Sequence, residues 1–187
     1  MKIVLIHGFN VKDAGAGTVD KLRPYLEGMG YECESDAADY GYIKLWWVRL
    51  RKHSAIIRII NALHTADVVV AHSNGFNYAI KALSFILFRP IVLIGLSPAA
   101  STRVKFPMSV SSGYVFFTRS DFWVWVSGFL PWLDWGRLGQ HGYKGTDPRI
   151  ESIEFTDVVR DHSDWFDENT VGFTATEIDI VIQRSMT

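Results

Sequence analysis

Residues 70–75 (VAHSNG) place Ser73 between two small residues, Ala71 and Gly75, after an apolar run and before a helix-like stretch. This small–x–Ser–x–small pattern is typical of a nucleophile elbow, a sharp turn from a strand into a helix. A larger side chain two positions before or after the serine would clash with the neighbouring strand and helix. The turn would present the Ser73 hydroxyl at the carboxyl edge of a sheet, where it can attack a carbonyl carbon. The alternative is that Ser73 only caps the helix.

The first apolar run is followed by HGFN at residues 7–10, a second feature with chemical meaning. An HG pair at a strand end can present backbone N–H groups to a developing oxyanion. The predicted donors are the N–H groups of Phe9 and Asn74, and the dipole of the helix that starts at Asn74 would add to the field. We expect His7 to hold this loop rather than to react. The alternative is an ordinary strand-to-loop turn.

A general base for Ser73 must be a histidine that a carboxylate holds in one tautomer. The expected chain order is the serine, then the acid, then the histidine. Asp121 follows the apolar run at residues 114–118, and His162 precedes the last helix-like stretch, so these two are predicted to complete a triad. The elbow would turn the side chain of His72 away from the site. The rivals are His141 as the base and Asp134, Asp147 and Asp164 as the acid, and Asp164 can instead cap the last helix.

The elements that must position these residues alternate between short apolar runs and longer helix-like stretches. The runs are continuous and rich in β-branched or aromatic residues, like strands buried on both faces of a parallel sheet. They lie at residues 2–6, 67–71, 91–96 and 114–118, with weaker candidates at 31–35 and 150–155. Helix-like stretches lie at about 19–29, 51–63 and 75–88 and from about 163 onward. This alternation predicts an α/β fold, a three-layer α/β/α sandwich around a mostly parallel sheet.

Residues 121–145 break the alternation with four tryptophans and five glycines. The plainer interpretation is an irregular loop and a short helix that pack on the sheet. The alternative is a lid or an apolar wall of the substrate pocket, because loops at strand ends carry function in this architecture. We expect Asn10, Trp46 and Trp123 to line that pocket.

Composition sets further bounds on fold and function. The 187 residues are 48% hydrophobic and 21% charged, which predicts a single packed domain over residues 1–187. The chain has 19 basic and 20 acidic side chains and a net charge of −1. It therefore lacks the excess of positive charge that is typical of a nucleic-acid-binding protein. The single cysteine, Cys33, excludes an intrachain disulfide and a cysteine metal cluster. The loop after residue 6 contains neither GxGxxG nor GxxxxGK(S/T), the two common phosphate-binding motifs. Their absence there argues against a nucleotide-binding domain.

No apolar stretch reaches the roughly 20 residues of a membrane-spanning helix, and the N-terminus lacks the features of a secretory signal. We therefore expect no transmembrane segment and a cytoplasmic location.

Taken together, HGF at the first strand, AHSNG at the elbow, SD at residues 120–121 and HSDWF at 162–166 resemble the α/β-hydrolase superfamily. The TVDKLRPYLEGMGY and WGRLGQHGY stretches are also similar to a group of small bacterial and phage-type hydrolases. The resemblance implies a minimal fold of that superfamily, with a six-stranded sheet in the order 2-1-3-4-5-6 and a compact lipase- or cutinase-like frame. It further implies a serine hydrolase with a Ser–His–Asp triad and without a metal or a cofactor.

In that scheme Ser73 attacks, His162 transfers the proton, Asp121 orients His162, and the N–H groups of Phe9 and Asn74 bind the oxyanion. The expected reaction is hydrolysis of a carboxylic ester through an acyl-enzyme, with a small-molecule or acyl-ester substrate. Three alternatives stay open: a thioesterase, an acyltransferase with the same triad, and a non-catalytic binding protein of the same fold.

Overall fold

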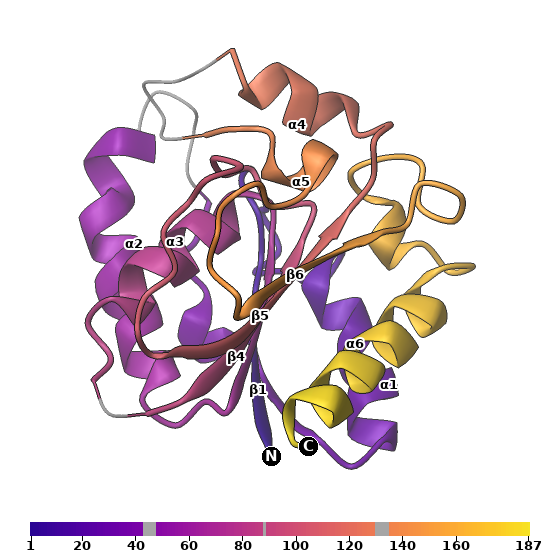
Figure 1. The fold of residues 1–187 in the computed structure, drawn as a ribbon. Helices are drawn as coiled ribbons and strands as arrows, with labels where there is room; N and C mark the ends of the chain where they lie inside the picture. Colours follow the sequence, from indigo (N-terminus) through magenta and orange to yellow (C-terminus); the bar gives the residue numbers. More distant parts are fainter. Residues whose placement is uncertain (43–47, 88, 130–134) are drawn as a thin grey trace.

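Six strands form one parallel sheet in the described part of the chain (Figure 1). The computed structural model spans residues 1–187, and the description excludes residues 43–47, 88 and 130–134 and the side chains of 48–52. The strands are β1 (Lys2–Ile6), β2 (Glu32–Glu34), β3 (Val68–His72), β4 (Ile91–Leu96), β5 (Val110–Phe117) and β6 (Ile150–Glu154). Their order is β2-β1-β3-β4-β5-β6, and all neighbouring pairs are parallel. The predicted order is confirmed.

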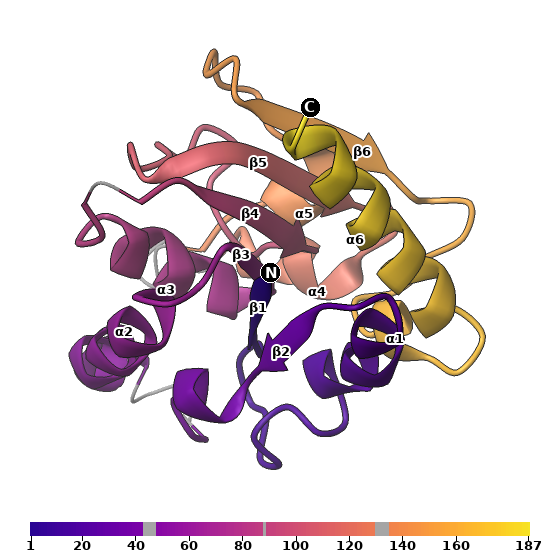
Figure 2. The same ribbon diagram turned by 90° about the horizontal axis from the view of Figure 1, so that it is seen from below.

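Helices cover both faces of this sheet. The described α-helices are α1 (Arg23–Gly28), α2 (Val48–Leu63), α3 (Asn74–Leu83), α4 (Phe122–Ser127), α5 (Leu138–His141) and α6 (Val171–Ser185). Short 3-10 helices are η1 (Val19–Leu22), η2 (Asp36–Ala38) and η5 (Asp164–Phe166). Figure 2 shows α2 and α3 on one face of the sheet and α1 and α6 on the other. This arrangement confirms the predicted three-layer α/β/α sandwich.

The alternation of side chains along β1 explains why both faces need a helical cover. Ile3 and Leu5 join the cluster beneath α1 and α6, whereas Val4 and Ile6 join the cluster beneath α2 and α3. All four are fully or almost fully buried. Successive residues of a strand point to opposite faces, so a strand covered on both sides reads as one continuous apolar run.

Several element boundaries differ from those expected. Strand β5 begins at Val110 rather than 114, because its pairing with β4 continues through a register shift beyond the apolar run. The stretch 19–29 divides into η1 and α1, and α3 ends at Leu83 rather than 88. The last stretch is helical only from Val171, after the short η5 turn. For β5, pairing with β4, which local composition does not encode, sets the strand's start.

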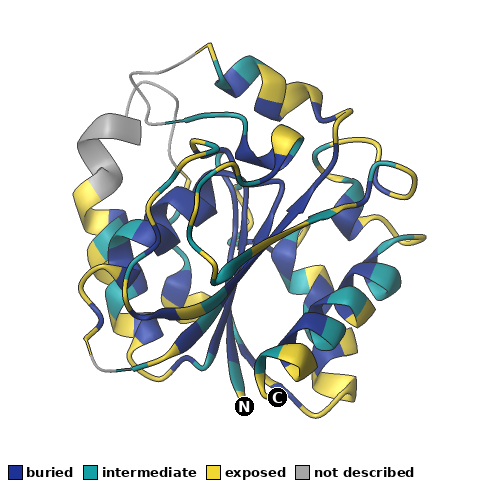
Figure 3. Ribbon diagram, in the orientation of Figure 1, coloured by how far each residue is buried: buried dark blue, intermediate teal, exposed yellow. Residues whose placement is uncertain are grey.

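Exposed residues lie mainly on the outer helix faces, the loops and the edge strand β6, and the central strands of the sheet are mostly buried (Figure 3). Helix α4 carries three large apolar side chains that are exposed, those of Phe122, Trp123 and Trp125. Figure 1 shows α4 and α5 at the end of the sheet opposite the chain's N-terminus, where the carboxyl ends of the strands lie. None of the described helices is both long and apolar enough to cross a membrane.

Candidate active site

Ser73 lies at the junction of β3 and α3 with a strained backbone. Its φ is 53° and its ψ is −124°, a conformation that non-glycine residues rarely adopt and that recurs at functional sites. Its hydroxyl makes no capping hydrogen bond to α3, so the helix-cap alternative is wrong. A Cβ added at Gly75 would lie only 2.2 Å from the His7 carbonyl oxygen, which explains the small residue two positions after the serine.

Asp121 and His162, the predicted acid and base, are joined directly. Nδ1–H of His162 donates to Oδ2 of Asp121 over 2.8 Å, and the Asp121 side chain is fully buried. The other carboxylate oxygen accepts the backbone N–H of Val124 at 2.9 Å and so caps α4. With its proton on Nδ1, the imidazole keeps Nε2 free as a base. No hydrogen bond joins Ser73 to His162 within the described residues, although both line one pocket. Such bonds are often long before substrate binds.

Two further residues support the loop that carries His162. Nε2–H of His72 donates to the His162 carbonyl over 3.0 Å, and the two rings lie 4.5 Å apart. Burial, and then the nearby charge of His162, holds the pKa of His72 well below its usual range, so this ring stays neutral. Asp164 accepts the backbone N–H groups of Arg160 and Asp161 at 3.0 and 2.8 Å. It therefore shapes this loop and does not cap the last helix, whose N-cap is Thr170.

The predicted oxyanion donors come from two elements, Phe9 from the loop after β1 and Asn74 from the first turn of α3. The backbone N–H groups of Phe9 and Asn74 have no acceptor within the described part of the chain. Asn74 is also the first residue of α3, where the helix dipole favours negative charge. Asn10, the next residue after Phe9, has a φ of 63° and completes a tight turn.

Three side chains hold the loop that carries Phe9. His7 Nε2 lies 2.9 Å from Oδ1 of Asp39, and Nδ1 lies 2.9 Å from the Gly8 carbonyl oxygen. The Tyr40 hydroxyl donates to the carbonyl oxygens of His7 and Gly8 at 2.9 and 2.6 Å. Burial raises the pKa of Tyr40 well above its usual range, so the hydroxyl keeps the proton that it donates. These contacts give His7 the loop-holding position that the sequence suggested.

We expect the replacement Asp39→Asn to remove one pH-dependent contribution to the free energy of unfolding. Burial raises the pKa of Asp39, but the hydrogen bonds from the Gly41 N–H and the His7 ring lower it by more. The net shift of the Asp39 pKa is therefore downward. A carboxyl whose pKa is lower in the folded state stabilises above its unfolded pKa, and this is lost as the pH falls through the folded pKa. Asp39→Asn should therefore cost about 1–2 kcal/mol at pH 7 and progressively less below about pH 4.

Urea unfolding of the wild type and of Asp39→Asn between pH 3 and pH 7 measures this difference. Asp157→Asn is the matched control, because Asp157 is exposed and its replacement removes the same charge. A gap between the wild type and Asp39→Asn that stays constant down to pH 3 would contradict the expected ionisation of Asp39.

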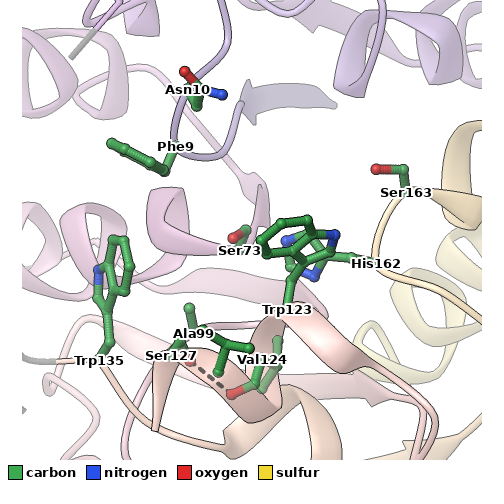
Figure 4. A pocket seen from close by; sticks show the side chains of 11 residues that line it. Phe9, Asn10, Ser73, Ala99, Trp123, Val124, Ser127, Trp135, His162 and Ser163 are labelled. Atoms are coloured by element: carbon green, nitrogen blue, oxygen red, sulfur yellow. Dashed lines mark hydrogen bonds between the residues drawn. The ribbon is translucent and has the colours of Figure 1, made fainter. Parts of the chain in front are cut away.

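The pocket at the elbow has a volume of about 410 Å³, within the range of small-molecule sites (Figure 4). Its lining side chains are mainly apolar, and the described ones include no carboxylate, ammonium or guanidinium group. They are Phe9, Asn10, Ser73, Ala99, Trp123, Val124, Val126, Ser127, Trp135, His162 and Ser163. Asn10 and Trp123 were expected here, whereas Trp46 lies outside the described residues.

The rival residues lie elsewhere or have other partners. His141 is exposed on α5 and does not line the pocket. Asp147 forms an ion pair with Arg149 at 2.6 Å, and Asp134 lies outside the described residues. Among the described side chains, no group of three or more His, Cys, Asp or Glu is placed to hold a metal ion.

Comparison with known proteins identifies the fold. No protein-family model and no curated protein matches the sequence. A methylesterase from Arabidopsis is 13% identical, with a TM-score of 0.61 over 97% of this chain and 98% of the other. An extracellular alpha/beta-hydrolase from a Paenibacillus species is 10% identical, with a TM-score of 0.63 over 95% and 97%. A pyrethroid hydrolase from Sphingobium faniae is 11% identical, with a TM-score of 0.59 over 96% of each chain. With its parallel sheet in the order 2-1-3-4-5-6, this protein has the α/β-hydrolase fold.

Proposed function

We propose that this protein is a serine hydrolase that cleaves carboxylic esters through an acyl-enzyme. The observation that carries the proposal is the 2.8 Å bond between His162 and the fully buried Asp121, at a pocket that also contains the strained Ser73. A histidine oriented by a carboxylate beside an elbow serine is the arrangement that activates a hydroxyl for attack on a carbonyl group.

The reaction would proceed in two halves. Ser73 Oγ forms a bond to the ester carbonyl carbon while Nε2 of His162 accepts its proton. The carbonyl oxygen becomes an oxyanion that the N–H groups of Phe9 and Asn74 stabilise. Collapse breaks the bond to the alkoxy group, which leaves as an alcohol with the proton from His162. Water then attacks the acyl-enzyme with His162 as base, and the products are the carboxylic acid and free Ser73.

The solved structures of similar fold support a hydrolase, because those named above are a methylesterase and two hydrolases. The apolar pocket favours an ester over a charged substrate. The described lining has no carboxylate, ammonium or guanidinium group, so an uncharged ester can enter it without an unpaired charge, whereas an ionic group would lose its hydration there.

Labelling with a fluorophosphonate probe, followed by intact-mass measurement, tests the proposal. We expect one adduct on the wild type and none on Ser73→Ala, with hydrolysis of a p-nitrophenyl ester reduced at least about 10³-fold in the variant. Ser111→Ala is the matched control, because Ser111 is exposed on β5 and lies outside the pocket. A folded wild type that forms no adduct and turns over no ester would refute the proposal and favour a binding protein.

A further inference from the structure

One tryptophan contacts the side chains of both predicted oxyanion donors. Nε1–H of Trp135 donates to Oδ1 of Asn74 over 2.6 Å. The Trp135 ring also meets the Phe9 ring edge-on, with centroids 5.5 Å apart. Figure 4 shows the rings of Phe9 and Trp135 on one side of the pocket and the indole of Trp123 on the other. Trp135 thus connects the loop after β1 with the first residue of α3.

The hydrogen bond to Trp135 matters to Asn74 because the Asn74 side chain is buried. Only 2% of this residue is exposed, and its Nδ2 atom has no hydrogen-bond partner among the described residues. An indole N–H is a donor only, so it fixes the amide of Asn74 with its oxygen toward Trp135. Loss of that donor would leave a second buried polar atom without a partner.

The backbone that follows Trp135 is fixed against the segment after β4. Leu138 N–H donates to the Ala100 carbonyl at 2.9 Å, and Gly139 N–H donates to the Pro98 carbonyl at 2.8 Å. A Cβ added at Gly139 would lie 2.4 Å from the Ser97 backbone, so close packing requires glycine there. Trp135 therefore projects from an anchored chain, and its ring can restrain the residues that it contacts.

We propose that Trp135 is a positioning residue for the oxyanion hole and, with Phe9 and Trp123, a wall that selects an uncharged apolar group of the ester. The inference rests on the proposed function. Oxyanion donors act only when held close to the productive geometry, and a displacement of about 1 Å can cost 10²-fold in rate. A substrate group that packs on Trp135 presses on the same ring that restrains Phe9 and Asn74. Substrate fit and oxyanion binding are thereby coupled.

The positioning role is tested with a double-mutant cycle of Trp135→Phe and Asn74→Ala. Trp135→Phe keeps an aromatic ring against Phe9 but removes the donor, and Asn74→Ala removes the acceptor while keeping the backbone N–H. We expect each to lower kcat about 10-fold with KM changed less than about threefold, and the double variant to be no slower than either single one. Trp125→Phe is the control, because Trp125 is exposed on α4 outside the pocket and should keep wild-type kcat.

The selectivity is tested with matched p-nitrophenyl esters of equal chain length that end in a methyl or a carboxylate group. We expect kcat/KM at least about 10-fold lower for the carboxylate ester. Equal rates would overturn the selective wall. Independent, multiplying effects of Trp135→Phe and Asn74→Ala, or a change confined to KM, would overturn the positioning role.

A readout that needs no activity separates this inference from the proposed function. The Trp135 indole N–H resonance, assigned by its loss in Trp135→Phe, should exchange slowly with solvent and shift in Asn74→Ala. Rapid exchange in the wild type would overturn the restraint even in an active enzyme. If the wild type did not react with the fluorophosphonate probe but its Trp135 N–H exchanged slowly, the proposed function would be wrong. The restraint on Trp135 would still exist.

Discussion

The replacement Asp121→Asn is expected to lower kcat about 10⁴-fold while the protein stays folded. Asparagine cannot hold His162 in the tautomer with its proton on Nδ1, because the amide offers an N–H group as readily as an oxygen. In the other tautomer Nε2 carries the proton, so His162 cannot accept the proton of Ser73. The fold should tolerate the change, since Asp121 also caps α4 through the N–H of Val124, and asparagine caps helices as well as aspartate does.

Steady-state hydrolysis of a p-nitrophenyl ester and thermal unfolding, measured together, separate these two roles of Asp121. Asp147→Asn is the control, because Asp147 is bound to Arg149 outside the pocket and its replacement should leave kcat unchanged. A loss below about 10-fold in Asp121→Asn would mean that Asp121 is chiefly a helix cap. The acid to test next would then be Asp161, which accepts the His162 backbone N–H at 2.7 Å.

The sheet and the placing of the candidate triad could be predicted from the sequence for a simple physical reason. Continuous apolar runs mark strands that are buried on both sides, and parallel strands bring their carboxyl ends to one edge. Ser73 and Asp121 each follow such a run, and His162 follows the weaker strand candidate at residues 150–155, so the sequence places all three residues toward one edge without knowledge of side-chain contacts. Strand β6, which lies at the edge of the sheet and is half exposed, gave only a weak signal for the same reason.

The supporting contacts could not be predicted, because they join residues far apart in sequence by geometry alone. Nothing near Asp39 or Tyr40 in the sequence indicates that they hold the loop after β1. The bond between Trp135 and Asn74 likewise depends on how the segment after β4 is anchored. His72 does not line the pocket, and its bond to the His162 carbonyl has no local signature in the sequence.

The replacement Gly75→Ala is expected to destabilise the protein by about 3 kcal/mol and to reduce the rate of labelling more than about 10²-fold. The added Cβ would lie 2.2 Å from the His7 carbonyl oxygen and 3.0 Å from atoms of Ile6. Ile6 is held by pairing with Ala71 on β3, so β1 cannot yield cheaply. The clash must instead push α3 away from β1, which separates the N–H groups of Phe9 and Asn74 and widens the oxyanion hole.

Urea unfolding and the rate of fluorophosphonate labelling measure the two effects of Gly75→Ala. Gly28→Ala is the matched control, because a Cβ at this last residue of α1 meets nothing within 4 Å. That change should leave labelling intact and raise stability by up to about 1 kcal/mol, since alanine favours helix over glycine. If Gly75→Ala unfolded and reacted like the wild type, α3 would have to shift freely against β1. The close approach of the two elements would then play no part in placing the oxyanion donors.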